Sequence, residues 1–311
     1  MKTPPWLGLE YLLLINPRDG TVPLDDTFTE TVEYHGRTFQ KYALANKVYF
    51  LPVDEDEVTR LESMHSVLCR LFDNKLIFPP VDQPRRILDC GFGAGDWAID
   101  VAKQFPESEV IGLDISPHMI SADLPDNLDL QIDDLNASFT FPSAHFDVVH
   151  SQMVCGGIDA NRWSGYVRDM FRVLRPGGWC QMVEMYFNAQ SDNGSLSRVH
   201  ALSRWSSLYL SSLARYKDPR AALQLDQWMM RAGFTEVEYR LLRIPMCPWQ
   251  AEPRYQDIGR ANIENIPWLL RSLAFYPFTK LEGISVEEFD DLVSDAAEEA
   301  GDIRLKPYFP L

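Results

Sequence analysis

The sequence lacks closely spaced cysteines. Its five cysteines are an odd number, stand far apart and form no C-x-x-C pair; they are Cys69, Cys90, Cys155, Cys180 and Cys247. Paired cysteines at short spacing are usual in zinc and redox sites, and disulfide scaffolds carry even sets. We therefore expect reduced and mostly buried thiols, and no metal site.

Long hydrophobic runs are also missing. Near the N-terminus the only apolar run is Leu12–Ile15. This run is too short for the hydrophobic region of a signal peptide or for a membrane span. The sequence thus predicts a soluble, cytoplasmic protein with no membrane partner.

Positive charge is scarce as well. The chain has 29 Lys and Arg residues against 45 Asp and Glu residues, a formal net charge of -16. Proteins that bind a phosphate backbone present faces rich in Lys and Arg. Nucleic acid is therefore excluded as a partner, and a neutral or cationic small molecule is the more natural one.

What the sequence does contain, between residues 86 and 185, is a regular alternation of short aliphatic runs and helical segments. The expected strands are Arg86–Cys90, Glu109–Asp114, Leu128–Asp133, Phe146–His150 and Gly178–Met185, and the expected helices are Asp96–Gln104, Pro117–Ala122 and Arg162–Leu174. This alternation predicts a doubly wound α/β fold with a mainly parallel sheet. Ligands of such sheets bind at the carboxyl ends of the strands.

The flanking segments differ in pattern. Turn and helical periodicity predict a hairpin at Val32–Phe39, helices at Asp54–Phe78, Leu196–Arg215, Ala221–Ala232, Trp268–Phe275 and Val286–Ala300, and a strand at Glu236–Ile244, with Gly233 as a helix C-cap. We expect an N-terminal lid (residues 1–45), a core (46–245) with a helical insertion at about 190–232, and a helical extension (246–311).

A glycine-rich loop follows the first expected strand. It reads Gly91-Phe92-Gly93-Ala94-Gly95 and leads directly into a helix. Glycines let the backbone pass close to a ligand, and the helix N-terminus offers free N–H groups. The dinucleotide fingerprint G-x-G-x-x-G would need a glycine at Asp96, and no Gly-Lys-Ser/Thr follows the loop. NAD binding is thus disfavoured, and phosphate binding of the Walker type is excluded.

Carboxylates stand at the ends of the next two strands. Asp114 ends the second strand, where a doubly wound fold binds ribose hydroxyls. Asp133 and Asp134 end the third strand, where a carboxylate can accept a hydrogen bond from an adenine amino group. We favour Asp114 as the ribose ligand and Asp134 for the adenine contact.

With these elements in order, the chain resembles class I S-adenosylmethionine (SAM)-dependent methyltransferases. The resemblance is carried by ILDCGFGAG, VIGLDISPHMI, DDL with FTFPSAHFDVVH, and RVLRPGGW. It implies a Rossmann-like, seven-stranded sheet with a helical lid. The segment around YFLPVDEDE, the GDWAID after the loop and the GGW ending in Glu184 are similar, more narrowly, to the LaeA-like methyltransferases of fungal secondary metabolism.

The resemblance also implies a set of cofactor-binding residues. They are Asp89, Gly91, Phe92, Gly93, Gly95, Asp114, Ile115, Asp133, Asp134, Leu135 and His150. SAM would be the cofactor and S-adenosylhomocysteine the product. Asp89 would order the loop or contact the methionine end of SAM, and His150 would lie near that end or near the methyl acceptor.

The expected reaction is metal-independent O- or N-methylation of a small, largely apolar acceptor. If the acceptor is a hydroxyl, a base must remove a proton, and His150, His200 and Glu184 are the candidates. Two alternatives stay open. One is a LaeA-like regulator that acts through partner binding, which would allow a nuclear location; the other is a SAM-binding enzyme with non-methylating chemistry, such as a cyclisation. The oligomeric state has no signal in the sequence.

Overall fold

The computed structural model describes residues 22–121 and 123–311. A parallel sheet of five strands forms its centre, in the order β5-β4-β3-β6-β7. The strands are β3 (Arg86–Cys90), β4 (Glu109–Asp114), β5 (Leu128–Ile132), β6 (Phe146–Gln152) and β7 (Leu174–Val183). The predicted α/β class and parallel sheet are confirmed, whereas the apolar run Leu12–Ile15 lies outside the described residues.

The sheet has fewer strands than predicted. We expected seven, and the sheet formed by the described residues has five. Most of the expected strand Glu236–Ile244 is irregular, and only Arg243–Pro245 pairs, as β8, with β9 (Tyr308–Pro310) in a separate two-stranded sheet. The expected helix at Pro117–Ala122 is also wrong, since Pro117–Ser121 is turn and coil. The described residues of the connection between β4 and β5 therefore contain no helix.

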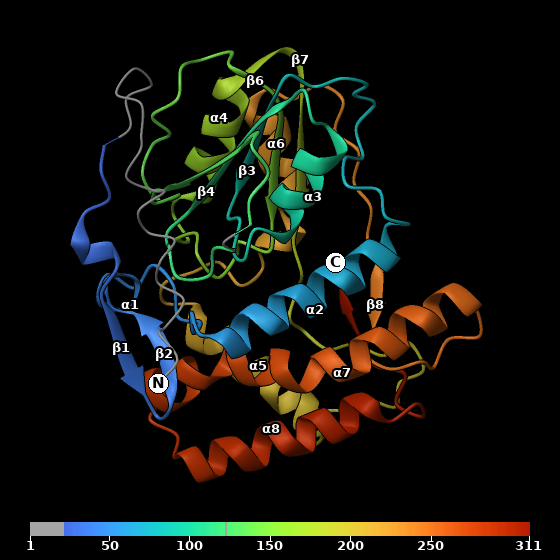
Figure 1. Ribbon diagram of the computed structural model, residues 1–311. Helices are drawn as coiled ribbons and strands as arrows, with labels where there is room; N and C mark the ends of the chain where they lie inside the picture. Colours follow the sequence, from blue (N-terminus) through green and yellow to red (C-terminus); the bar gives the residue numbers. More distant parts are fainter. Residues whose placement is uncertain (1–21, 122) are drawn as a thin grey trace.

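Helices cover both faces of the sheet (Figure 1). On one face α3 (Asp96–Gln104) packs Trp97, Ala98 and Val101 against the sheet. On the other face lie α4 (Trp163–Val173) and α6 (Leu225–Ala232), and Gly233 ends α6 in the left-handed conformation, as predicted. The central strands are apolar on both sides because both faces are buried.

The strand order reverses between β3 and β6, which are neighbours in the sheet although β4 and β5 lie between them in the sequence. Asp89 on β3 and His150 on β6 are register partners at this point. A crevice forms at the carboxyl ends of strands where the order reverses. The fold therefore brings these two side chains together beside the glycine-rich loop.

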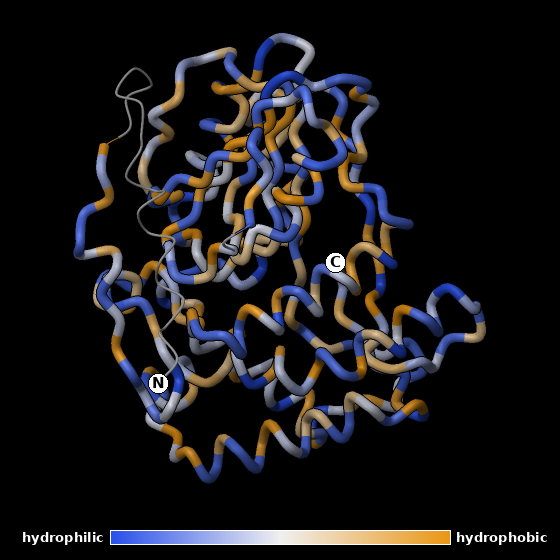
Figure 2. Tube along the Cα trace, viewed as in Figure 1, coloured by the Kyte–Doolittle hydropathy of each residue, from blue (hydrophilic) through white to orange (hydrophobic). Residues whose placement is uncertain are grey.

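A layer of helices lies beneath the carboxyl edge of the sheet (Figure 1). It contains α2 (Glu55–Leu71), α5 (Ala201–Leu213), α7 (Pro253–Tyr276) and α8 (Val286–Gly301). Asp54 caps α2 through a hydrogen bond from the Glu57 N–H, and Ser285 caps α8 in a capping box. Figure 2 shows apolar residues recurring along these helices.

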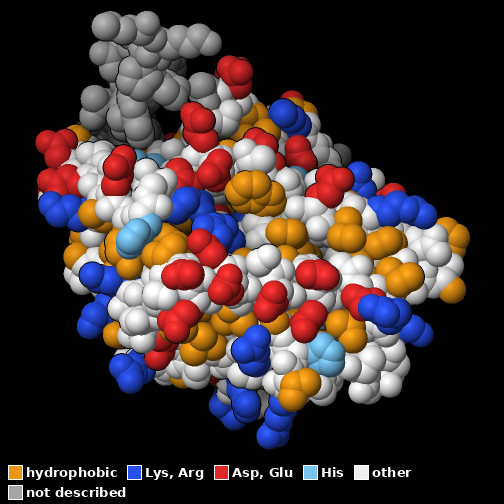
Figure 3. Space-filling model, turned by 90° about the horizontal axis from the view of Figure 1, so that it is seen from below, with side chains coloured by type: hydrophobic (Ala, Val, Ile, Leu, Met, Phe, Trp, Pro, Cys, Tyr) orange, Lys and Arg blue, Asp and Glu red, His pale blue; other side chains and the backbone are white. Residues whose placement is uncertain are grey.

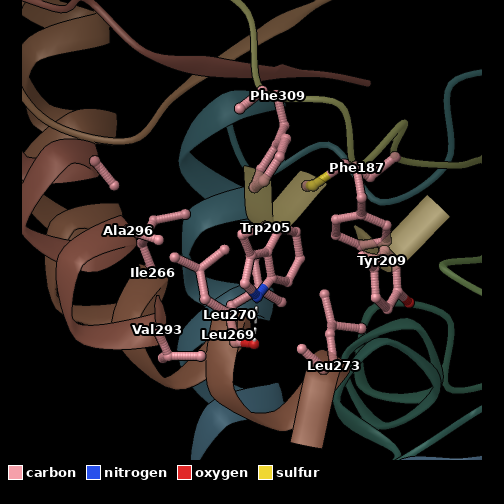
Figure 4. Packing of buried hydrophobic residues seen from close by; sticks show 14 of the residues in the cluster. Phe187, Trp205, Tyr209, Ile266, Leu269, Leu270, Leu273, Val293, Ala296 and Phe309 are labelled. Carbon is pink, nitrogen blue, oxygen red and sulfur yellow. Dashed lines mark hydrogen bonds between the residues drawn. The ribbon is translucent and has the colours of Figure 1, made fainter. Parts of the chain in front are cut away.

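Trp205 lies at the centre of this layer (Figure 4). Its indole is fully buried, stacks on Tyr209 and donates a hydrogen bond to the Leu270 carbonyl oxygen at 3.1 Å. Side chains from α5, α7 and α8 surround it, including Val293 from α8, and Phe309 from β9 joins them. We call this group of four helices, with its core, the helical layer.

The remaining N-terminal elements attach to the helical layer. The predicted hairpin is present as β1 (Thr31–Tyr34) and β2 (Arg37–Gln40), followed by α1 (Lys41–Ala45). Phe39 shares a hydrophobic cluster with α2 and the C-terminal helices. The division of the chain into lid, core and extension remains a proposal. In space, residues of all three parts contribute to the hydrophobic core of the helical layer.

The outer face of α8 is acidic. Phe289, Val293, Ala296 and Ala300 face inward. Most of the intervening acidic side chains are exposed, namely Glu287, Glu288, Asp291, Asp295 and Glu298. Figure 3 views the molecule from this side and shows acidic side chains gathered across it. Among the described residues, no helix is both long and apolar enough to cross a membrane.

Candidate functional site

The glycine-rich loop turns sharply between β3 and α3. Gly91, Gly93 and Gly95 all adopt positive φ, at 83°, 60° and 90°. A side chain at Gly91 would also collide with Val154, since a Cβ there would lie 2.4 Å from its Cγ1. Gly95 is the N-cap of α3 and has no side chain that could accept a hydrogen bond from the first N–H groups of the helix. The loop thus needs glycine both for its conformation and for close packing.

Asp114 supports this loop from the end of β4. Its carboxylate accepts hydrogen bonds from the Gly93 N–H at 2.9 Å and from the Ser116 N–H at 3.0 Å. Burial raises the pKa of Asp114 to about 6, although these backbone hydrogen bonds act to lower it. A carboxylate has about four acceptor positions, so two backbone bonds leave capacity for a ligand. Asp114 and the neighbouring Ile115 both line a pocket at this edge.

The two aspartates after β5 differ in position. Asp134 lines the pocket with Leu135 and Asn136, and its Oδ1 accepts hydrogen bonds from the backbone and side-chain amides of Asn136. Asp133 is not among the pocket residues; its Oδ1 accepts a hydrogen bond from the Asp134 N–H. Of the predicted pair, only Asp134 therefore faces the pocket.

Asp89 and His150 form a buried pair at the switch point. His150 Nδ1 lies 2.9 Å from Asp89 Oδ1, and both side chains are at most 4% exposed. The imidazole stacks on the Trp97 indole, with ring centroids 3.6 Å apart. His150 Nε2 is buried and has no hydrogen-bond partner among the described residues. The sequence analysis missed Trp97, although its position in the first turn after the glycine loop could have suggested it.

Two predicted catalytic candidates do not reach the pocket. Both oxygens of Glu184 accept backbone N–H groups, from Val154 at 2.8 Å and Cys155 at 3.2 Å, so this carboxylate holds the loop after β6. Burial raises its pKa to about 7. His200 precedes α5 and bonds Ser197 through Nδ1. Neither residue lines the pocket.

The pocket itself lies between the sheet edge and the helical layer. Its floor is the glycine loop with the ends of β4, β5 and β6, and its opposite wall is mostly apolar: Leu51, Leu61, Met64, Leu68, Phe187, Leu269 and Leu273. Tyr49 and Tyr209 add phenol groups, and burial raises the pKa of both.

One buried cation belongs to this wall. Arg60 forms a two-pronged ion pair with Glu57 in the first turns of α2, with distances down to 2.6 Å, and both side chains are at most 5% exposed. The sequence analysis assigned no role to Arg60. An acidic and a basic residue three apart on a helix are common on surfaces, so the sequence held no signal that this pair is buried.

Comparisons with known proteins match both a part of the chain and most of its length. The family model for a methyltransferase domain matches residues 87–178, which span β3 to the middle of β7. A solved structure of phosphoethanolamine N-methyltransferase 2 from Haemonchus contortus, in complex with S-adenosylhomocysteine, is 21% identical with a TM-score of 0.47. That likeness covers 79% of this chain, and this chain spans about half of that protein, 51% of its length.

Curated relatives align over nearly the whole chain. The secondary metabolism regulator laeA of Monascus pilosus is 31% identical, over 89% of this chain and 75% of the relative. The protein-methionine methyltransferase laeA of Emericella nidulans is 29% identical, over 92% of this chain and 77% of the relative. The Monascus pilosus relative exceeds 30% identity over most of both chains, and this chain therefore belongs to the LaeA-like family of SAM-dependent methyltransferases.

Proposed function

We propose that the pocket binds SAM along the carboxyl edge of the sheet and that the chain methylates a small, largely apolar acceptor. Bound SAM supplies an electrophilic methyl group on a sulfonium. In this proposal Asp114 binds the ribose, Asp134 the adenine amino group, and Gly91 and Gly93 let the backbone approach. Phe92, Gly95, Ile115 and Leu135 shape the same edge.

The observation that carries this proposal is the unsatisfied nitrogen of His150. A buried polar atom without a partner is costly, and in native sites such an atom usually serves a ligand. The Asp89 carboxylate accepts hydrogen bonds and donates none. It therefore favours the tautomer with the proton on His150 Nδ1, which leaves a lone pair on Nε2. Nε2 can then accept a hydrogen bond from the cofactor, or a proton from an acceptor hydroxyl.

The apolar wall supports the acceptor half of the proposal. Met64, Leu68, Phe187, Leu269 and Leu273 face the pocket from the helical layer. Such a wall favours apolar groups and excludes water. Packing against it would hold the acceptor in position for in-line attack on the methyl carbon. Tyr49, Tyr209 and Arg60 are the polar groups that can orient it.

A second candidate acceptor is a protein methionine. The Emericella nidulans relative is named a protein-methionine methyltransferase. A thioether loses no proton when it is methylated, so it needs no base, and its side chain suits an apolar wall. In that case His150 Nε2 would bind the cofactor only.

Methyl-labelled SAM separates these candidates. The protein is incubated with labelled SAM, first alone and then with a panel of small apolar phenols and amines, and the label is counted in the extracted small molecules and in the protein. We expect label in the small-molecule fraction. Label confined to protein, located on methionine by mass spectrometry, would favour the second candidate. Absence of label from both fractions, despite SAM binding measured by calorimetry, would overturn the proposal.

The role of His150 can be tested separately. If Nε2 takes a proton from the acceptor, His150→Ala lowers turnover by about 10²–10⁴-fold and lowers SAM affinity far less. Equal losses of turnover and affinity would instead assign His150 to the cofactor. His145→Ala is the matched control because His145 precedes the same strand and lies outside the pocket.

A further inference from the structure

Three potential metal ligands converge where α2 meets α3. His65 and Cys69 lie one turn apart on α2, and Asp100 faces them from α3. His65 Nε2 lies 2.9 Å from Asp100 Oδ2 and 3.4 Å from Cys69 Sγ. All three ligand atoms lie within 4.8 Å of one another. Thus a nitrogen, a sulfur and an oxygen point at one small volume.

These separations are close to those of a tetrahedral zinc site. With zinc bonds of about 2.0–2.3 Å, neighbouring ligand atoms lie about 3.3–3.7 Å apart. The pair already at 3.4 Å needs almost no movement, and the 2.9 Å pair needs to open by only a few tenths of an ångström. The Asp100 side chain is 45% exposed, so it has room to make this adjustment.

The donor set selects the metal. A thiolate, an imidazole and a carboxylate together suit Zn²⁺, whereas Mg²⁺ and Ca²⁺ prefer oxygen ligands alone. We propose that His65, Cys69 and Asp100 bind one Zn²⁺, with water as the fourth ligand. The three bonds form to His65 Nε2, Cys69 Sγ and an Asp100 oxygen, and the protons on Nε2 and Sγ leave to solvent.

The electrostatic surroundings favour a cation at this point. Asp96 lies one turn before Asp100 on α3, and its carboxylate interacts with both His65 and Asp100. A divalent ion would place its positive charge beside the Cys69 thiolate and these two carboxylates.

The position of the site gives it a structural consequence. His65 also lines the SAM pocket, and α3 begins at the glycine loop. Zinc would tie a helix of the helical layer to the helix that follows this loop. This inference does not rest on the proposed methyl acceptor, because the ligands lie on the two helices and not at the carboxyl strand ends.

Zinc binding to the whole chain tests the proposal. Protein freed of metal with a chelator is titrated with Zn²⁺ against a chromophoric competitor, and Co²⁺ is used as a spectroscopic probe. We expect one Zn²⁺ per chain and a thiolate-to-cobalt charge-transfer band in the near ultraviolet. Cys69→Ser should abolish that band. It should also weaken zinc binding by at least about 100-fold, since even outer-shell partners contribute about 10–100-fold.

Control variants keep the result interpretable. His65→Gln and Asp100→Asn should weaken zinc binding in the same way, and His145→Gln should not, because His145 lies outside the cluster. Circular dichroism of each metal-free variant checks the fold, and the exposed Asp100 allows one variant that leaves the core intact. Equal zinc affinity of wild type and Cys69→Ser, or cobalt spectra without the thiolate band, would overturn the proposal.

Discussion

The two walls of the pocket are built by different means. At the sheet edge, polar side chains are fixed by backbone hydrogen bonds and strand register, as at Asp114 and the Asp89–His150 pair. In the helical layer, apolar side chains from distant segments pack around Trp205, and Arg60 is held by Glu57. The first wall is thus fixed by hydrogen bonds and strand register within the sheet, and the second mainly by side-chain packing between helices. The helical wall can therefore change in sequence without disturbing the sheet edge.

The largest effect is expected from removing the centre of the helical layer. Trp205→Ala deletes a fully buried indole and should lower the free energy of unfolding by about 3–5 kcal/mol, as measured by urea denaturation. Trp268→Ala on α7 is the control, since its side chain is 52% exposed and its loss should change stability by no more than about 0.5 kcal/mol. If the two walls are separable, the folded Trp205 variant keeps its SAM affinity. A loss of SAM affinity together with stability would show that the two walls are not separable.

A somewhat smaller loss of stability is expected at the buried ion pair. Arg60→Met leaves the Glu57 carboxylate buried without its partner, which should cost about 3 kcal/mol. Adding Glu57→Leu removes the stranded charge, so the double variant should regain most of the stability. Arg240→Met is the control because the Arg240–Glu238 pair is exposed. A double variant as unstable as Arg60→Met would show that the cost is not electrostatic.

The sheet edge should respond in affinity rather than in stability. Asp114→Ala should weaken SAM binding by more than about tenfold, because it removes a charge-assisted contact worth about 1.5–3 kcal/mol. Calorimetry measures the affinity, and Asp133→Ala is the control because Asp133 lies outside the pocket. Unchanged affinity of the Asp114 variant would exclude Asp114 as the ribose ligand.

The smallest expected effect is a pH dependence of SAM binding. Ribose hydroxyls donate to an ionised carboxylate, and burial raises the pKa of Asp114 to about 6. As the pH falls below 6 the carboxyl becomes protonated, so affinity should decrease, to about tenfold weaker at pH 5 than at pH 7. Asp114→Asn should bind weakly with a flatter profile. An equally steep profile in that variant would assign the titration to another group.

The sequence predicted the sheet better than its surroundings. The bounds of β3, β4 and α3 agree with the structure because short aliphatic runs and an amphipathic helix are separated here by clear turn residues, such as the glycine-rich loop. The expected strand at Glu236–Ile244 was mostly wrong because strand formation depends on a partner, and only Arg243–Pro245 finds one in β9. The expected helix at Trp268 instead begins at Pro253 and runs through Pro267, a residue that usually marks a helix start or break.

The candidate site was predicted unevenly for the same reason. Asp114, Asp134 and His150 lie at or near the carboxyl ends of strands, so their meeting at one edge follows from the topology. The wall residues Phe187, Leu269 and others come from segments far apart in the chain. The prediction of a helical lid and a largely apolar acceptor indicated their apolar type and could not give their positions, because helix packing leaves little trace in local sequence.

The register of Asp89 with His150 makes the site dependent on strand length. Side chains alternate between the faces of a sheet, so removing a single residue from β3 or β6 ahead of the pair would turn one partner to the opposite face. Substitutions can thus accumulate at the carboxyl edge of this sheet, whereas insertions and deletions within these two strands would separate Asp89 from His150. Natural variation in length should therefore be confined to the loops, and any transplant of the site into another scaffold must move both strands together.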